Sequence, residues 1–288
     1  MNHPAELALH QYLQNAVEGK SHISDETIDR IASDIKDALK RQFGGNKREF
    51  RMRMSNVGKA SCQLWFEKNH PEKALPFPTT FVMNMMIGDI VEAIFKGLFR
   101  EANIEFKDSD SVDLELSDGT TVSGTYDLIL DGKIDDVKSA SNWSYKNKFN
   151  DFSSLKESDP FGYIAQLAGY AKAAGVEAGG WWVINKATGE FKYVAAEGID
   201  IDQEIAHIQH TIQKLESNEF ERCFEAEDEM FRGKPTGNKI LSNACSFCSY
   251  RYSCWPTLQE LPSIPSSAKE PKIINYVHIK EESMKNDY

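Results

Sequence analysis

The spacing of apolar residues along the chain has two periods, and together they predict helices that alternate with strands. Steps of three and four, as on one buried helix face, favour helices over 23–43, 81–102, 161–175 and 201–215. Short runs bounded by turn residues favour strands over 112–116, 120–130, 134–140, 179–186 and 190–196. The third helix is expected to start at Asp159-Pro160, because proline suits a first helical turn. This order predicts an α/β fold with a central mixed β-sheet flanked by helices.

Two of the expected strands form a hairpin that carries charged side chains where strands usually place apolar ones. Asp131-Gly132 lies between them and favours a two-residue turn whose central residues have positive φ. With that turn, Asp127 lies opposite Asp136, and Lys138 projects from the same face as Asp136. Like charges that face each other about 5 Å apart repel. A slip of one residue would change the face of each acid, and a solvated edge hairpin remains an alternative.

Composition narrows the classes of protein that fit. The chain has 288 residues, enough for one large domain or a domain with appendages, and a net charge of -11. This charge argues against a general nucleic-acid coat protein but leaves room for a local basic groove. Residues 36–59 carry eight basic side chains against two acidic ones, as a solvated helix end or as a phosphate-contacting edge. On the second interpretation, the expected nucleic-acid contacts are Arg48, Arg51, Arg53 and Lys59.

The cellular location follows from what the sequence lacks. No apolar run of about 18 residues occurs, so we expect no membrane helix and no membrane partner. The first twenty residues lack a basic leader and an apolar core, so we expect no signal peptide and a cytoplasmic protein. In a reducing compartment, the five cysteines are expected to be ligands or buried thiols rather than disulfides.

Further polar residues accompany the hairpin in a fixed order along the chain. Glu92 precedes it on an expected helix, and Gln166 and Tyr170 follow it on one face of another, at i and i+4. Together with Asp127 and the Asp136-x-Lys138 pair, this set resembles the PD-(D/E)XK nuclease superfamily, and within it the RecB-like exonuclease branch. Tyr126 stands where the superfamily's name implies proline.

The resemblance implies a restriction-endonuclease-like core and a phosphodiester-cleaving site. By it, Glu92, Asp127 and Asp136 bind Mg²⁺ or Mn²⁺, hard cations that prefer oxygen ligands and would neutralise the apposed acids. Lys138 would orient or activate the attacking water and stabilise charge on the phosphate. Gln166 and Tyr170 would position the lysine, a metal-bound water or a phosphate, although packing against the sheet explains Tyr170 equally well.

The cysteines provide a second, independent pattern. Cys245, Cys248 and Cys254 form a close triplet without a local fourth ligand, so Cys62 is the natural distant partner. Cys223 is left over and is expected to be buried. This one-plus-three arrangement resembles the iron–sulfur members of the RecB-like branch, which include CRISPR-adaptation nucleases and AddB helicase-nucleases. The resemblance implies that the four cysteines bind a [4Fe–4S] cluster of structural role, with zinc or free thiols as the alternatives.

These observations lead to one predicted organisation and function. We expect a helical N-terminal region over 1–55, a nuclease domain with its cluster region over 56–260, and a loosely ordered tail over 261–288. The predicted activity is that of a metal-dependent DNA exonuclease acting on single strands or duplex ends in recombination, repair or phage DNA metabolism. DNA is the expected partner, with recombination or replication proteins beside it. The alternatives are a structure-specific DNA endonuclease and a non-catalytic iron–sulfur DNA-binding subunit.

Overall fold

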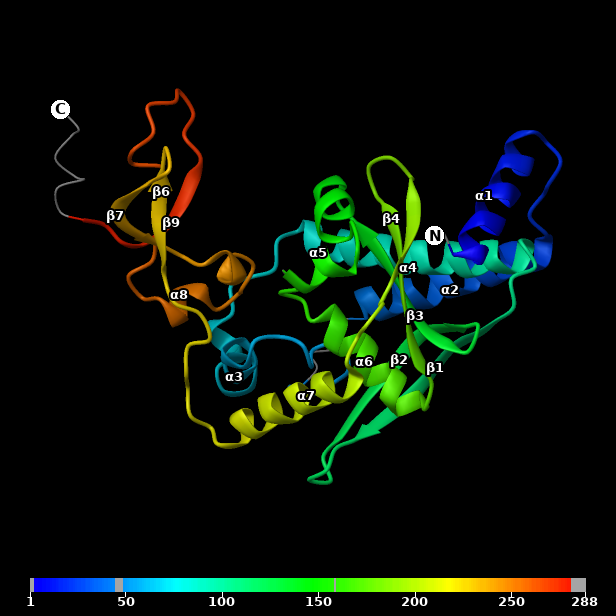
Figure 1. The fold of residues 1–288 in the computed structure, drawn as a ribbon, viewed down its shortest axis with the longest axis horizontal. Coiled ribbons are helices and arrows are strands. Elements are labelled where there is room, and N and C mark those ends of the chain that lie inside the picture. Colours follow the sequence, from blue (N-terminus) through cyan, green and yellow to red (C-terminus); the bar gives the residue numbers. More distant parts are fainter. Residues whose placement is uncertain (1–2, 45–48, 158, 281–288) are drawn as a thin grey trace. The chain divides into compact units, whose positions relative to one another are not determined.

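The structure is a computed structural model that describes residues 3–44, 49–157 and 159–280. The chain divides into two compact units (Figure 1). Unit 1 comprises Met1–Lys59 and Pro78–Ile212, and unit 2 comprises Ala60–Phe77 and Gln213–Tyr288. Each unit is therefore assembled from two segments that are distant in sequence.

A five-stranded sheet forms the centre of unit 1, in the order β1-β2-β3-β4-β5 (Figure 1). Neighbouring strands are antiparallel except β3 and β4, which are parallel, so the sheet is mixed as predicted. Trp181 and Trp182 of β4 are fully buried, one on each face of the sheet. The strands are β1 (Phe106–Glu115), β2 (Thr121–Leu130), β3 (Lys133–Ala140), β4 (Glu177–Asn185) and β5 (Phe191–Ala195).

Helices cover the sheet because each presents one apolar face to it. Helix α4 buries Phe95 and Phe99 against Leu128 and Trp182, while α6 buries Leu167 in the core that contains Trp181. Mixed α/β architecture with a central sheet between helices is thus observed. The helices of unit 1 are α1 (Pro4–Val17), α2 (Asp25–Phe43), α4 (Thr80–Glu101), η2 (Ser144–Lys148), α5 (Phe152–Glu157), α6 (Tyr163–Ala174) and most of α7 (Ile201–Glu216), whose last residues from Gln213 belong to unit 2.

Unit 2 contains a smaller, four-stranded antiparallel sheet in the order β6-β7-β9-β8. Its apolar cluster is built on Leu241, Trp255 and Leu258. The carboxylate of Glu229 is buried and accepts hydrogen bonds from the side chains of Thr236 and Asn238 at 2.8 Å, and from Tyr276. The elements are α3 (Ser61–Asn69), η1 (Pro71–Lys73), β6 (Glu227–Phe231), β7 (Lys234–Ile240), η3 (Asn243–Cys245), α8 (Arg251–Cys254), β8 (Gln259–Pro262) and β9 (Ile273–His278).

Three local expectations differ from the structure. The tail expected to be loosely ordered from residue 261 contributes β9, because Ile273–His278 pairs with both β7 and β8. The region 1–55 groups in unit 1 with the strands that carry Asp127 and Asp136, and 56–260 is shared between the two units. Helix α6 begins at Tyr163 rather than at Pro160, because Gly162 before it adopts a left-handed conformation with φ of 71°.

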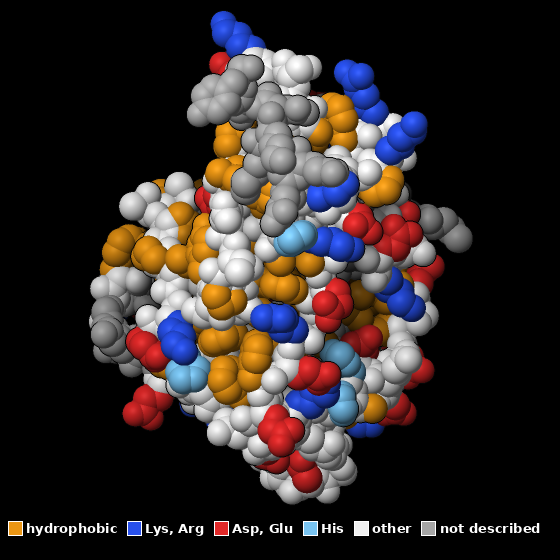
Figure 2. Space-filling view, turned by 90° about the vertical axis from the view of Figure 1, so that its left-hand side faces the viewer, with side chains coloured by type: hydrophobic (Ala, Val, Ile, Leu, Met, Phe, Trp, Pro, Cys, Tyr) orange, Lys and Arg blue, Asp and Glu red, His pale blue; other side chains and the backbone are white. Residues whose placement is uncertain are grey.

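The surface of the described residues is mixed in character. On the face drawn in Figure 2, basic, acidic and apolar side chains are interspersed. None of the helices among the described residues is both long enough and apolar enough to cross a membrane.

Candidate metal-dependent site

The hairpin that carries the predicted acids has the predicted register. Asp131 and Gly132 both have positive φ, of 49° and 75°, as a tight primed turn requires. Leu128 pairs with Asp135, and Leu130 pairs with Lys133. Beyond Leu128 the backbone pairing stops, because the Val137 N–H donates to the Asp127 carboxylate at 2.8 Å instead of to a backbone carbonyl. The side chain of Asp127 is thereby anchored across the hairpin.

Consecutive acids on β3 point to opposite faces of the sheet, as strand geometry requires. Asp135 is buried on the Trp182 face, where it accepts hydrogen bonds from Trp182 Nε1 and Tyr193 Oη at 2.9 Å and from Gly180 N at 2.8 Å. These three donors give it a structural role. Asp136 is also buried, and it projects from the opposite face, the one that carries Asp127, as the expected register requires.

Lys138 joins Asp136 on that face. Its Nζ lies 2.5 Å from Asp136 Oδ2, and the two side chains are 19% and 5% exposed. Burial lowers the pKa of Lys138, but the charges of Asp136 and Asp127 outweigh it and raise the pKa above the usual value. Lys138 Nζ also lies 5.1 Å from the ring centre of Tyr163, at the start of α6. The lysine is therefore a fixed cation between two acids and an aromatic ring.

Helix α4 brings the third predicted acid, Glu92, to the same place. Burial raises the pKa of Glu92 to about 7, and the negative charge of Asp127 adds to the rise. Glu92 Oε1 accepts a hydrogen bond from Lys96 at 2.6 Å, one helical turn further along. Lys96 is 4% exposed and also contacts Asp108 at 3.2 Å.

The acids repel one another in the absence of a cation. Burial raises the pKa of Asp127 to about 6, and the charge of Asp136 raises it further. Burial likewise raises the pKa of Asp136, whose charge is partly offset by Lys138. Asp136 Oδ2 is buried and has an ion pair with Lys138 but no directed hydrogen bond. These buried, destabilised carboxylate oxygens fit a hard divalent cation.

The predicted ligands are close but are not arranged as a finished coordination sphere. No group of three or more His, Cys, Asp or Glu among residues 3–44, 49–157 and 159–280 has the geometry to hold a metal ion. In unit 1 two of these acids form ion pairs with lysines instead: Lys96 contacts Glu92, and Lys138 contacts Asp136. Binding of a metal cation by the three predicted acids would require both ammonium groups to move away from the carboxylates.

Gln166 and Tyr170 of α6 reach the same group of charges. Burial raises the pKa of Tyr170 to about 12, a hydrogen bond with Gln166 opposes the rise, and Asp136 and Asp127 add to it. Gly124 on β2 makes this approach feasible, since a Cβ there would lie 2.8 Å from Tyr170 Cε1 and 2.4 Å from Met54 Cβ. The structure thus couples five of the residues predicted as catalytic, and Gln166 is connected to them through its hydrogen bond with Tyr170; the five are Glu92, Asp127, Asp136, Lys138 and Tyr170.

The predicted basic stretch is attached to the same part of the sheet. Met54 N donates to Ser123 O at 3.0 Å, and Arg53 forms a bridge to Ser123. This segment therefore meets β2 in the half of the strand that does not pair with β3. Arg51 is exposed, whereas Arg53 and Lys59 are half-buried. Arg48, the remaining predicted contact, lies outside the described residues.

Helix α2 adds a further cation near the site. Arg41 and Gln42 donate to the two carboxylate oxygens of Asp89 at 2.9 Å, and Asp89 contributes to the raised pKa of Glu92. Sequence reasoning missed Asp89, and it also missed Lys96. The signal for Lys96 was its i+4 spacing from Glu92, which places both side chains on one face of a helix.

All five cysteines lie in unit 2, on segments that are far apart in sequence. Burial raises the pKa of Cys245 to about 12, and the neighbouring Cys248 and Cys254 raise it further. Cys254 also raises the pKa of Cys62 and of Cys248. The four predicted ligands are therefore close enough to shift one another's pKa values, although they, like the acids, do not form a group arranged to hold a metal ion among the described residues. Thiolate sulfur is the type of donor that iron–sulfur clusters and structural zinc use.

The expectation that Cys223 is buried is wrong. Cys223 is exposed, and its sulfur accepts a hydrogen bond from Cys62 N at 3.1 Å and lies 3.3 Å from Ser61 Oγ. The side-chain hydrogen bond with Cys62 lowers the pKa of Cys223 and raises that of Cys62. Cys223 therefore belongs to the same group of thiols, although its position in the sequence gave no sign of it.

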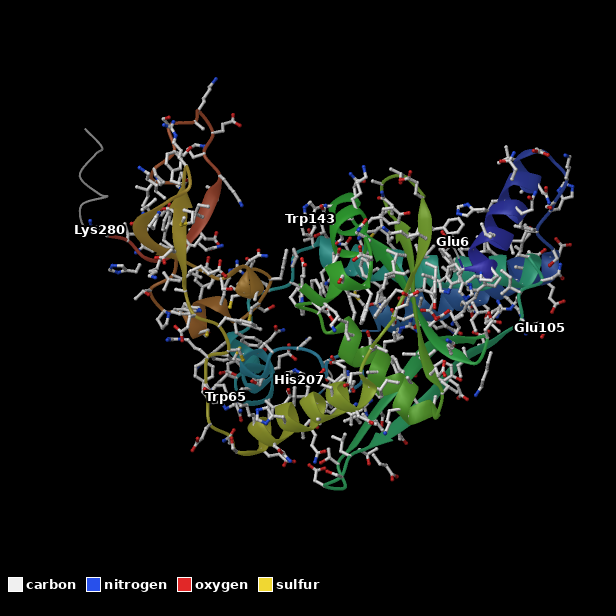
Figure 3. All side chains as sticks on the ribbon, viewed as in Figure 1. Glu6, Trp65, Glu105, Trp143, His207 and Lys280 are labelled. Carbon is white, nitrogen blue, oxygen red and sulfur yellow. The ribbon has the colours of Figure 1, made fainter. Side chains whose placement is uncertain are left out.

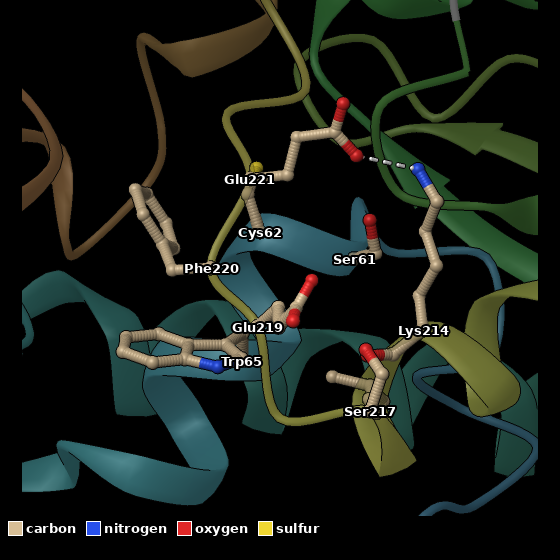
Figure 4. Close-up of a pocket in the computed structure, with 9 residues that line it drawn as sticks. Ser61, Cys62, Trp65, Lys214, Ser217, Glu219, Phe220 and Glu221 are labelled. Carbon is tan, nitrogen blue, oxygen red and sulfur yellow. Dashed lines mark hydrogen bonds and ion pairs between the residues drawn. The ribbon is translucent and has the colours of Figure 1, made fainter.

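A cavity of about 480 Å³ in unit 2 opens beside Cys62 (Figure 4). Trp65 and Phe220 line one side of it, and an ion pair between Lys214 and Glu221, at 2.9 Å, lines another. The six predicted catalytic residues are not among its lining residues. The cavity gives solvent a route to one of the predicted cluster ligands.

Comparisons with known proteins add little to this geometry. No family model matches the chain, and no curated protein matches it. A solved structure described as "Crystal structure of SSO0001" is similar to the chain, with a TM-score of 0.39 and 15% sequence identity. The similarity covers 63% of this chain and 85% of that chain.

Proposed function

We propose that the chain is a metal-dependent DNA exonuclease with a PD-(D/E)XK core of the RecB-like iron–sulfur branch. The observation that carries the proposal is the convergence of Glu92, Asp127, Asp136 and Lys138 from a helix and two strands onto one electrostatically coupled site. Buried acids that repel one another destabilise a fold. A cation-dependent activity gives a reason for keeping three of them beside one lysine.

Each residue has a role that its contacts support. Glu92, Asp127 and Asp136 would hold Mg²⁺ or Mn²⁺, which when bound supplies a Lewis acid for the scissile phosphate and lowers the pKa of a coordinated water. The Val137 N–H fixes the Asp127 carboxylate. Asp136 keeps Lys138 charged and in place, so that the ammonium can stabilise negative charge developing on the phosphate oxygens.

The surroundings of the site suit a polyanionic substrate. Gln166 and Tyr170 would contact the lysine or a phosphate oxygen, and the charges of Asp136, Asp127 and Lys138 already act on Tyr170. The segment that carries Arg51 and Arg53 runs along β2, which also carries Asp127. Arginine neutralises phosphates along a strand, and this local basic edge offsets the acidic balance of the whole chain.

The thiols of unit 2 would hold a [4Fe–4S] cluster through Cys62, Cys245, Cys248 and Cys254. Phosphodiester hydrolysis transfers no electrons, so the role of the cluster is to hold together two segments of unit 2. Cys62 lies on α3 and the other three follow β7, which makes the cluster a cross-link between distant parts of the sequence.

End-labelled linear DNA and closed circular DNA, each with Mg²⁺ or Mn²⁺, test the activity. Release of nucleotides from linear DNA alone is expected, and it should be lost in Asp127→Asn. Asp131→Asn is the matched control, since Asp131 lies at the exposed tip of the same hairpin and asparagine tolerates its positive φ. Cleavage of closed circles would indicate an endonuclease instead. Binding without cleavage of either DNA would indicate a non-catalytic subunit.

A further inference from the structure

Trp143 is an exposed aromatic residue just beyond the strand that carries Asp136 and Lys138. Its side chain is 67% exposed, whereas Trp181 and Trp182 are fully buried and Trp255 is 8% exposed. Figure 3 labels Trp143 in the part of unit 1 where β3 ends. Exposure of a single aromatic side chain is common on protein surfaces, so the argument for a ligand rests on where Trp143 lies and on what surrounds it.

The backbone around Trp143 is fixed although its indole ring is exposed. Asn147 Nδ2 donates to the Trp143 carbonyl, and Tyr145 N donates to Ser141 O, both at 2.8 Å. Asn142 accepts a hydrogen bond from Asn185 of β4 at 3.0 Å. A ring on an anchored backbone loses little conformational freedom on binding, so it is a suitable platform for a flat ligand.

Trp143 lies where ligands commonly bind to sheets with parallel strands. Ala140 and Asn185, the last residues of the parallel strands β3 and β4, are paired, and ligands bind outside such carboxyl ends. Trp143 follows Lys138 by five positions, so their Cα atoms are at most about 18 Å apart. This spacing suits a strand that extends a few nucleotides beyond the scissile phosphate.

The neighbouring side chains are basic and apolar. Lys186 N donates to Ala140 O at 2.9 Å, and its exposed ammonium donates to Asn84 at the start of α4 at 3.1 Å. Met83 and Met85, on either side of Asn84, are 58% and 43% exposed. A cation beside apolar surface matches the alternation of phosphate and base along a single strand.

We propose that Trp143 stacks on a base of single-stranded DNA next to the cleavage site and so selects single strands over duplexes. The inference rests on the proposed function for the choice of DNA. In a duplex the faces of the bases are already stacked on one another. An exposed indole can therefore stack on a base only at a frayed end. A single strand offers free faces of any base, so the preference is for strandedness and not for sequence.

Binding to the Asp127→Asn variant without divalent metal tests the proposal apart from catalysis. A fluorescently labelled dT12 oligonucleotide is titrated by anisotropy against a duplex of equal length. Replacing Trp143 by alanine should raise the Kd for dT12 about tenfold, as expected for one lost stacking contact, and change the Kd for the duplex little. Trp143→Phe should retain most of the affinity because it retains a ring. Leu7→Ala removes another exposed apolar side chain of unit 1 and should change neither Kd.

Tryptophan fluorescence gives a second readout that a purely structural role would not produce. Stacking should quench the exposed indole as dT12 binds, and the quenching should be lost in Trp143→Phe although binding persists. Wild-type protein that cleaves DNA, with an unchanged dT12 Kd in Trp143→Ala, overturns this inference alone. Wild-type protein that binds dT12 through Trp143 but cleaves nothing overturns the proposed nuclease and leaves the binding inference in place.

Discussion

Units 1 and 2 each gather the side chains of one candidate metal site, but they hold them on different scaffolds. In unit 1 the acids stand on paired strands and on a helix of 22 residues, with two apolar clusters around them. In unit 2 the cysteines lie on short helices and turns, and the apolar cluster described there is built on three buried residues.

This difference indicates how each site depends on its ligand. The positions of Asp127 and Asp136 are set by hydrogen bonds and strand pairing that need no cation. The cysteine segments have less apolar burial to hold them, so the free energy of ligand binding contributes directly to folding there. We therefore infer that loss of metal leaves unit 1 folded but inactive, and leaves unit 2 destabilised.

The largest effect is expected in unit 1 from Lys138→Met. Removal of the Lys138 ammonium should lower the rate of DNA cleavage by about 10²- to 10³-fold, because a fixed charge directed at the reacting phosphate is lost. Far-UV circular dichroism should stay unchanged if the scaffold is independent of the site. Lys133→Met is the matched control, since Lys133 lies on the same strand and pairs with Glu177 at the surface. Undiminished cleavage by Lys138→Met would remove the lysine from the mechanism.

The next effect concerns the cluster in unit 2. Freshly purified protein should be brown, with absorbance near ~400 nm from thiolate-bound iron. Replacing any one of Cys62, Cys245, Cys248 and Cys254 by serine should bleach it, and limited proteolysis should then cut unit 2 before unit 1. Cys223→Ser is the control and should keep its colour, because a serine oxygen can still accept the Cys62 N–H. A colourless anaerobic preparation with one equivalent of zinc would show that the cysteines bind zinc and not an iron–sulfur cluster.

Parts governed by local chemistry could be predicted from the sequence. Asp131-Gly132 sets the loop length, and the loop length sets the register that brings Asp127 and Asp136 to one face. The helix expected over 201–215 from its apolar spacing, observed as α7, is a second such case. In each case a few neighbouring residues determine the outcome.

Parts governed by tertiary contacts could not be predicted in this way. The strand at Ile273–His278 is stabilised by partners on both sides, which its Pro- and Ser-rich surroundings did not reveal. Cys223 joins the other thiols through a hydrogen bond across more than 160 residues, and Lys96 contacts Asp108 of β1, a different element, at 3.2 Å. Spacing along the chain carries no information on such approaches.

A moderate effect is expected from the basic segment beside β2. Reversing Arg51 and Arg53 to glutamate should weaken DNA binding and flatten the plot of log K against log salt by about 1.5, because two phosphate contacts are lost. Reversal of Lys20 and Lys172, exposed lysines of the same unit, matches the change in net charge and should alter the slope less. Equal slopes in both variants would assign Arg51 and Arg53 to a solvated surface.

The smallest effect tests whether the acids repel one another in the metal-free scaffold. Asp127→Asn should raise the free energy of unfolding in EDTA at pH 7 by about 1 kcal/mol, because one buried charge is removed and one pKa unit corresponds to about 1.4 kcal/mol. The folded pKa of Asp127, about 6, lies above its unfolded value. The folded state therefore binds more protons between pH 4 and 6, and metal-free stability should fall as pH rises through that range.

Thermal unfolding across that pH range, with and without Mg²⁺, measures this repulsion. The wild-type Tm should fall with rising pH in EDTA and recover with Mg²⁺, whereas Asp127→Asn should show a shallower fall and a smaller recovery. Asp131→Asn should follow the wild type, because that carboxylate is 69% exposed at the hairpin tip. If Asp127→Asn were instead less stable than the wild type at pH 7 in EDTA, the bond from Val137 N–H would outweigh the repulsion. Unit 1 would then resemble unit 2 in needing its site intact in order to fold.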